Sequence, residues 1–169
     1  METTQKLLMN ERQVQQRINR LAWQVAEHCF GETEIIMAGI AANGYKLAQR
    51  LKSTIESISE IRIQLIELRI NKEEPLNSKV TLPVSGDELK GKTVIVVDDV
   101  SNSGRTLMYG VKPFLDFPVK SVLTLVLVDR DHNRFPVKTN FVGLSLATTM
   151  LEHVQVEIPD TGETTVYLN

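Results

Sequence analysis

Two adjacent carboxylates and the loop after them form the part of the sequence best suited to chemistry. Asp98 and Asp99 end a run of β-branched residues, and a loop of small and polar residues follows. Backbone N–H groups where such a loop enters a helix carry partial positive charge and suit a phosphate. Since carboxylates would repel that anion, we expect sugar hydroxyls or a magnesium ion between them. The residues expected to bind the phosphate are Ser101, Asn102, Ser103, Gly104, Arg105 and Thr106.

The whole segment 93–106 also resembles a known motif. Four apolar positions, two acids and a Ser-Gly-Arg-Thr turn are similar to the phosphoribosyl-pyrophosphate signature of type I phosphoribosyltransferases. The resemblance implies that Asp98 and Asp99 are the catalytic acids that hold the ribose hydroxyls, while residues 101–106 hold the 5-phosphate. It also implies Mg²⁺ as cofactor, reached by the same carboxylates through water. The alternative is a buried strand that ends in a solvated Asp-Asp turn, and it explains less of the pattern.

A second turn of this kind follows an expected strand at residues 34–40. The segment 39–51 resembles the pyrophosphate-binding loop of the same family, which implies pyrophosphate contacts from the turn Ala41, Ala42, Asn43 and Gly44. Relatives that regulate the pyrimidine operon have lysine and arginine in this turn. Because charge-assisted hydrogen bonds are therefore absent here, we expect weak pyrophosphate binding.

The segment 129–153 is expected to form the base pocket and a small hood. The pattern Val-Asp-Arg-x-His-x-x-x-Pro-Val, followed by Phe-Val-Gly, closely resembles the family of bifunctional pyrimidine operon attenuation regulators and uracil phosphoribosyltransferases. That resemblance implies base contacts from Asp129, Arg130, Phe141 and Val142. For Phe141 and Val142 a short core strand is an equally good interpretation, and the sequence leaves both open.

The elements that would position these residues follow an α/β order. Apolar periodicity predicts helices after Asn10, over residues 45–58 and from Thr106, the last kinked or ended by Pro113. Alternating helices and strands imply right-handed crossovers in a mostly parallel twisted sheet with helices on both faces. The ligand crevice would lie at the carboxyl strand ends. Strands are expected at residues 34–40, 61–70, 93–97 and 121–128, with a closing hairpin over 154–158 and 164–168.

Residues 71–90 differ in composition from the segments on either side. Pro75, Pro83 and Gly86, with several charges, leave little material for a core. The family resemblance implies a flexible flap that closes over the reacting centre, and a long loop of this kind is often a lid. The relatives begin this segment with Tyr-Arg-Asp-Asp, whereas this chain has Asn-Lys-Glu-Glu. An ordinary β-hairpin is therefore the second interpretation.

Composition narrows the classes of protein further. The 169 residues fit a single domain, 1–169, with a sizeable core. A net charge of -2 provides no basic field, so RNA binding is not expected. Cys29 is the only cysteine, and no apolar run could span a membrane, so a reducing cytoplasm is the expected location. The family resemblance implies a homodimer or a larger homo-oligomer.

The resemblance implies a pentosyl-transferring glycosyltransferase of nucleotide salvage. Its partners would be phosphoribosyl pyrophosphate and a nucleobase, with a nucleoside 5′-monophosphate and pyrophosphate as products. Asn102 occupies the loop position where purine enzymes of the superfamily have an aspartate, and an amide cannot do that acid-base work. Uracil is therefore the expected base. The alternative, favoured by Ala41, Ala42 and the altered flap, is a catalytically weak or inactive nucleotide-binding regulatory protein on the same fold.

Overall fold

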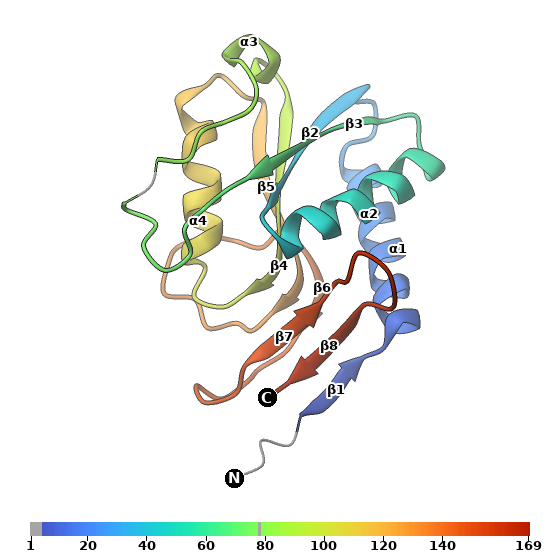
Figure 1. Ribbon diagram of the computed structural model, residues 1–169. Helices are drawn as coiled ribbons and strands as arrows, with labels where there is room; N and C mark the ends of the chain where they lie inside the picture. The colour runs from blue at the N-terminus through green and yellow to red at the C-terminus, as the bar shows by residue number, and fades with distance from the viewer. Residues whose placement is uncertain (1–4, 78) are drawn as a thin grey trace.

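A parallel five-stranded sheet forms the centre of the protein in the computed structural model, which describes residues 5–77 and 79–169. The strand order is β3-β2-β4-β5-β6, and every pairing is parallel. The predicted α/β fold class is therefore confirmed (Figure 1). The strands are β2 (Glu34–Ile40), β3 (Arg62–Leu68), β4 (Thr93–Ser101), β5 (Ser121–Asp129) and β6 (Phe141–Ser145).

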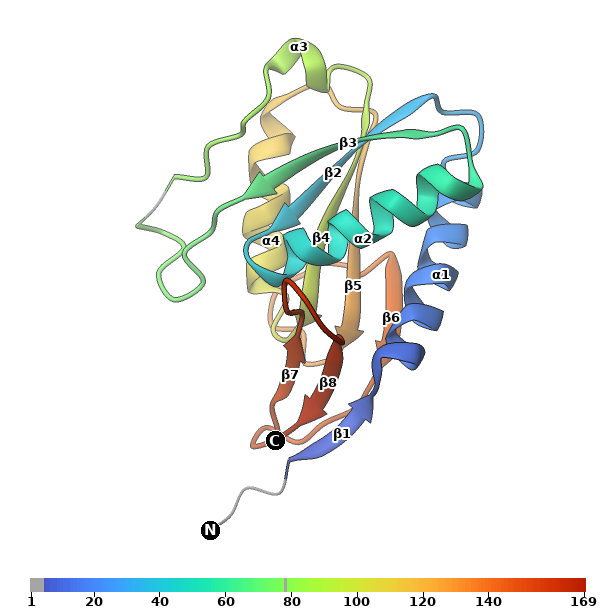
Figure 2. The same ribbon diagram turned by 45° about the vertical axis from the view of Figure 1, so that its right-hand side comes forward.

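Helices cover both faces of this sheet because alternate strand residues point to opposite sides. In β4, Ile95 and Val97 pack with the helices α1 (Glu11–His28) and α2 (Asn43–Ile58). Val94 and Val96 pack on the other face, with α4 (Arg105–Val111) and the 3-10 helix η1 (Lys112–Asp116). Figure 2 shows the sheet between these two layers. None of the helices in residues 5–77 and 79–169 is long and apolar enough to cross a membrane.

Local sequence signals set the helix boundaries. The side chain of Asn10 accepts a hydrogen bond from the backbone of Gln13, and the side chain of Gln13 accepts one from Asn10, both at 3.0 Å. This capping box starts α1 where it was predicted. Pro113 acts as predicted too, since α4 ends at Val111 and the chain continues as η1.

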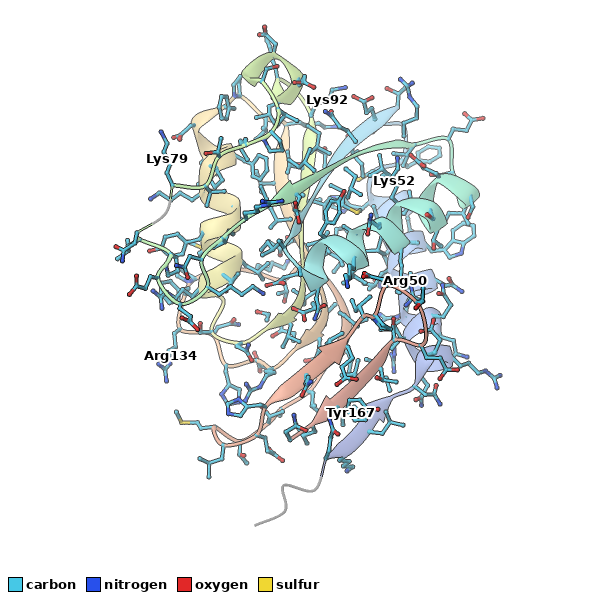
Figure 3. The ribbon with its side chains drawn as sticks, viewed as in Figure 1. Arg50, Lys52, Lys79, Lys92, Arg134 and Tyr167 are labelled. Carbon is cyan, nitrogen blue, oxygen red and sulfur yellow. The ribbon has the colours of Figure 1, made fainter. Side chains whose placement is uncertain are left out.

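A small antiparallel sheet lies beyond the carboxyl ends of the parallel strands. It contains β1 (Lys6–Met9), β8 (Thr165–Leu168) and β7 (Val154–Glu157), in that order. Arg50 of α2 points toward this sheet (Figure 3) and donates to the Thr164 hydroxyl at 2.8 Å and to Glu11 at 2.6 Å. The predicted closing hairpin is confirmed. Residues 129–153, expected to form the base pocket and a small hood, contain the end of β5, loops and β6.

The flap segment does not form a β-hairpin. Outside residue 78, which is not described, residues 71–85 are irregular, and the short helix α3 (Gly86–Leu89) follows. The hairpin interpretation is wrong for a physical reason, because Pro75 and Pro83 lack the N–H group that a strand ladder requires.

Candidate active site

A hollow of about 380 Å³ lies at the carboxyl end of β4. Its walls combine the acidic pair, the following loop, Lys72 of the flap and Val154 of β7. The loop opens at Ser101, which pairs with Asp129 of β5 in the sheet register. The predicted acidic and phosphate-loop residues are therefore brought to a single cavity. They are Asp98, Asp99, Ser101, Asn102, Ser103, Gly104, Arg105 and Thr106.

Asp98 is a buried carboxylate, with only 2% of its side chain exposed. Burial first, and then the negative charge of Asp99, raise the pKa of Asp98 from 3.8 to about 7. The ammonium of Lys72 acts in the opposite direction, since its Nζ lies 3.3 Å from the Asp98 carboxylate. The flap thus places a positive charge on the more deeply buried of the two acids.

Asp99 is held by the turn that was predicted to bind pyrophosphate. Its Oδ2 accepts a hydrogen bond of 2.9 Å from the side-chain amide of Asn43, which also donates to the carbonyl of Val156 at 2.8 Å. The start of α2 lies against β4, because a Cβ on Gly44 would come within 2.6 Å of the Val97 carbonyl oxygen. Only glycine permits this approach.

The remaining turn residues are Ala41 and Ala42, joined by a cis peptide bond. The backbone N–H of Ala41 donates to the carbonyl of Leu68 at 2.8 Å, so it is committed to the neighbouring strand β3. Neither alanine carries a charge. A positive charge does reach the acidic pair from the flap, where Lys72 contacts Asp98.

The phosphate loop has the geometry of an anion cradle. Gly104 has φ +80°, in the left-handed region, and a Cβ there would lie 2.6 Å from Val137 Cγ1. The carbonyl of Ser103 faces away and accepts from the backbone N–H groups of Arg134 and Phe135 at 2.8 and 3.1 Å. Within residues 5–77 and 79–169, no acceptor takes the amides of Asn102, Ser103 or Gly104. These donors remain available for an anion.

The hydroxyl of Ser101 adds an unused donor to this loop. Its oxygen is buried and has no hydrogen-bond partner in the described part of the chain. An unpaired buried hydroxyl costs about 1–3 kcal/mol, so a ligand oxygen that accepts from it would recover free energy.

None of the four residues expected at the base lines this hollow, although Asp129 and Arg130 contact the loop that does. Arg130 is buried, and its guanidinium donates to the side-chain oxygen of Asn102 at 2.7 Å and to the hydroxyl of Thr148 at 2.9 Å. The carboxylate of Asp129 accepts from the backbone of Asp131 and from the Thr139 hydroxyl. Both side chains therefore brace the loops beside the hollow.

Phe141 and Val142 lie elsewhere, and the core-strand interpretation describes them. They begin β6, where Phe141 pairs with Leu125, four residues before the end of β5. The Phe141 ring contacts His28 of α1 edge-on, with centroids 5.6 Å apart. The core strand expected at these positions is therefore present, and contact of Phe141 and Val142 with a base stays a prediction.

Lys72 was not among the residues predicted for the site. Nothing in its local sequence distinguishes it from the other charged residues of the flap, and its partner lies 26 positions away. A cation expected in the pyrophosphate turn, residues 41–44, is absent there, because the positive charge of Lys72 reaches the acidic pair from a different loop.

The acidic pair offers carboxylate oxygens, which are ligands that magnesium prefers. The described residues contain no group of three or more His, Cys, Asp or Glu side chains placed to hold a metal ion. Magnesium in phosphate-transfer sites usually takes one or two protein carboxylates and completes its shell with water and substrate phosphates. Asp98 already attracts the ammonium of Lys72, so the acidic pair also suits a magnesium ion bound by one or two carboxylates.

The chain resembles known proteins both in sequence and in fold. The family model described as a phosphoribosyl transferase domain matches residues 5–161. The bifunctional protein PyrR of Brevibacillus brevis is 33% identical over 164 residues, covering 91% of this chain and 90% of the relative. The bifunctional protein PyrR of Haemophilus ducreyi is also 33% identical, over 159 residues that cover 90% and 89%.

Two solved structures share the fold. The hypoxanthine phosphoribosyltransferase of Trypanosoma cruzi superposes with a TM-score of 0.75 at 16% identity, covering 95% of both chains. A hypoxanthine-guanine phosphoribosyltransferase from Bacillus anthracis gives a TM-score of 0.70 at 24% identity, covering 83% of this chain and 81% of the other. At these identities the likeness establishes the architecture alone.

Proposed function

Because the chain belongs to the phosphoribosyltransferase family, close to the bifunctional PyrR proteins, we propose that it transfers the phosphoribosyl group of phosphoribosyl pyrophosphate to uracil. The observation that carries this proposal is one cavity lined both by two carboxylates and by loop residues whose amides have no acceptor within residues 5–77 and 79–169. A pentose 5-phosphate needs both features, since its dianion requires donors while its hydroxyls require acceptors.

In the proposed reaction, the 5-phosphate is bound by the amides of Asn102, Ser103 and Gly104, with the hydroxyl of Ser101 as a further donor. Asp98 and Asp99 accept hydrogen bonds from the 2- and 3-hydroxyls of the ribose. The C1–oxygen bond to pyrophosphate breaks, a C1–nitrogen bond to the base forms, and the base nitrogen loses its proton. Because C1 becomes positively charged in between, nearby carboxylates lower the barrier electrostatically.

Mg²⁺ is the cofactor in this proposal. Asp98 and Asp99 would hold it through water, and it would neutralise charge on the departing diphosphate. The chain's own part is to orient the ribose and to keep the two carboxylates in place. Asn43 does the latter for Asp99 through its hydrogen bond of 2.9 Å. No nucleophilic side chain is required, because positioning supplies much of the rate.

The base assignment rests on Asn102 and on the relatives. The side-chain oxygen of Asn102 accepts from Arg130, and an amide does not take up a proton at neutral pH. A purine whose ring nitrogen needs an acidic partner finds none at this position. Uracil has carbonyl oxygens and a ring N–H, and in this proposal backbone groups beside Arg130 form hydrogen bonds with them.

A second function is favoured by a specific observation. Lys72 contacts Asp98 and Asn43 contacts Asp99, so both carboxylates already have partners, and Ala41 and Ala42 bring no charge for pyrophosphate. A nucleotide-binding regulatory protein with little turnover would have these properties. Such a protein would bind uridine 5′-monophosphate through the phosphate loop and release it unchanged.

One experiment separates the two proposals. The protein is incubated with phosphoribosyl pyrophosphate, Mg²⁺ and, in turn, uracil, hypoxanthine or guanine, and nucleotide formation is followed by chromatography. We expect turnover with uracil and none in an Asp99→Asn variant, with Asp116→Asn as an exposed matched control. No turnover with any base, together with calorimetric binding of uridine 5′-monophosphate, would establish the regulatory function. Failure of both would overturn the site.

A further inference from the structure

A second hollow, of about 790 Å³, lies at the opposite end of the sheet, where β2 and β3 begin. It is lined by the end of α1 and by the two turns at residues 30–33 and 58–61. Figure 2 shows both turns at one end of the molecule, away from the phosphate loop that precedes α4. We call this hollow the α1–α2 end pocket. The proposed transfer reaction uses none of its residues.

Aromatic and aliphatic side chains form its walls. Trp23 is 60% exposed and Phe30 is 91% exposed, although both are large apolar residues that a folded protein usually covers. Ile58 and Ile61 complete the apolar lining. An exposed aromatic pair beside an apolar recess is a feature of binding sites, because each ring offers a large area at a small entropy cost.

The charged residues at the pocket all have the same sign. Its lining contains Glu27, Glu32 and Glu60 but no lysine or arginine. Glu32 is compensated, since its carboxylate lies 2.9 Å from the ammonium of Lys120. Glu27 and Glu60 have no ion pair within residues 5–77 and 79–169. Two uncompensated negative charges therefore border an aromatic recess.

The helices add to this negative potential. Both α1, with 18 residues, and α2, with 16 residues, end at the pocket. A helix carries partial negative charge at its carboxyl end, where the last carbonyl groups lack helical donors. The carboxylates and the helix ends come from different parts of the sequence, and both make the electrostatic potential of the pocket more negative.

We propose that the α1–α2 end pocket binds a small organic cation with an apolar body, such as an aryl or alkyl ammonium. The faces of Trp23 and Phe30 attract an ammonium group, and Glu27 and Glu60 compensate its charge. The two isoleucines accept the apolar body. The volume falls in the range of about 300–1,000 Å³ that is typical of small-molecule sites. An anion of the same shape would be repelled.

The test uses the only tryptophan of the chain, which is Trp23. Its fluorescence is followed while the full-length protein is titrated with benzyltrimethylammonium, benzyl alcohol or phenylacetate. We expect saturable binding of the cation, at least about tenfold tighter than that of the alcohol, and none of the anion. Calorimetry on the same samples detects binding that leaves the fluorescence unchanged. Absence of cation binding by both methods overturns the proposal.

Variants separate charge from apolar contact. Glu27→Gln with Glu60→Gln should weaken cation binding about tenfold and leave the alcohol unaffected, whereas the matched control Glu163→Gln, at an exposed carboxylate elsewhere, should change neither. Phe30→Ala should weaken both ligands. If the cation and the alcohol respond equally to the glutamine variants, the pocket is only an apolar surface. If a lysine-rich apolar peptide binds at least a thousandfold more tightly than benzyltrimethylammonium, the pocket is a protein interface and the small-cation proposal is wrong.

Discussion

Replacing Asp98 by asparagine should make the protein more stable at alkaline pH while it abolishes phosphoribosyl transfer. The carboxylate is buried, and its pKa is raised from 3.8 to about 7, first by burial and then by Asp99. A group whose pKa is higher in the folded than in the unfolded state favours folding below its unfolded pKa. That contribution is lost as the pH rises through the folded pKa. Ionised Asp98 therefore opposes folding above pH 7.

The size of the effect follows from the two pKa values. Each unit is worth about 1.4 kcal/mol, so a difference of about three units corresponds to about 4 kcal/mol at pH 8. At pH 5 the folded protein still keeps the proton, and the penalty is only about 1.7 kcal/mol. Asparagine has the same shape and does not titrate. The stability difference between the Asp98→Asn variant and the natural protein should thus grow by about 2–3 kcal/mol from pH 5 to pH 8.

Urea unfolding at the two pH values measures this change, and taking the difference between pH values cancels any packing effect of asparagine. The control is Asp116→Asn, which removes the same charge at an exposed position on η1 and should give a difference within about 0.5 kcal/mol. A gap that stays constant would mean that Asp98 is not perturbed. A gap that shrinks with rising pH would mean that Lys72 dominates burial and lowers the pKa, which would refute the reasoning.

Three other substitutions test the same cavity. Gly104 has φ +80°, and an added Cβ would lie 2.6 Å from Val137. Gly104→Ala should therefore lower the free energy of unfolding by about 1–3 kcal/mol in thermal unfolding and weaken the binding of ribose 5-phosphate in calorimetry. Unchanged binding would argue against the amide cradle. Lys72→Met should raise the pKa of Asp98 further, because the ammonium of Lys72 lowers that pKa. NMR of the side-chain carboxyl carbon measures the pKa of Asp98, and Lys79→Met is the control. Asn43→Ala should cost about 1–3 kcal/mol in urea unfolding, and no loss would show that its hydrogen bonds are replaced by water.

The geometry at the end of β4 was predictable because its signals are local. A run of β-branched residues specifies the strand, and the glycine at position 104 supplies the left-handed turn that starts α4. Parallel topology then fixes which edge carries the site, since all carboxyl ends meet there. The acidic pair and the loop of residues 101–106 therefore follow from a single segment, without knowledge of any distant contact.

The base side was less predictable because it depends on strand register. Phe141 and Val142 have the composition of a short buried strand and also match the family pattern, and only the pairing of Phe141 with Leu125 shows where that strand lies in the sheet. Alternation of apolar residues identifies a strand but does not fix its register relative to the neighbouring strand. Arg130 shows the same limit, since its hydrogen bond to Asn102 joins residues that are 28 positions apart.

The flap is where local and distant information combine. Its sequence lacks a hydrophobic pattern, and its prolines exclude a hairpin, yet Lys72 at its start reaches the most buried acid of the cavity. A ligand cation or ribose hydroxyl that binds Asp98 must compete with that ammonium, and by reciprocity a flap that holds Lys72 in place weakens the ligand. The positive charge missing from Ala41 and Ala42 is thus present at the acidic pair, but Lys72 carries it on a separate segment of the chain. We therefore expect a change that removes Lys72 from Asp98 to alter the affinity of any ligand that binds this carboxylate.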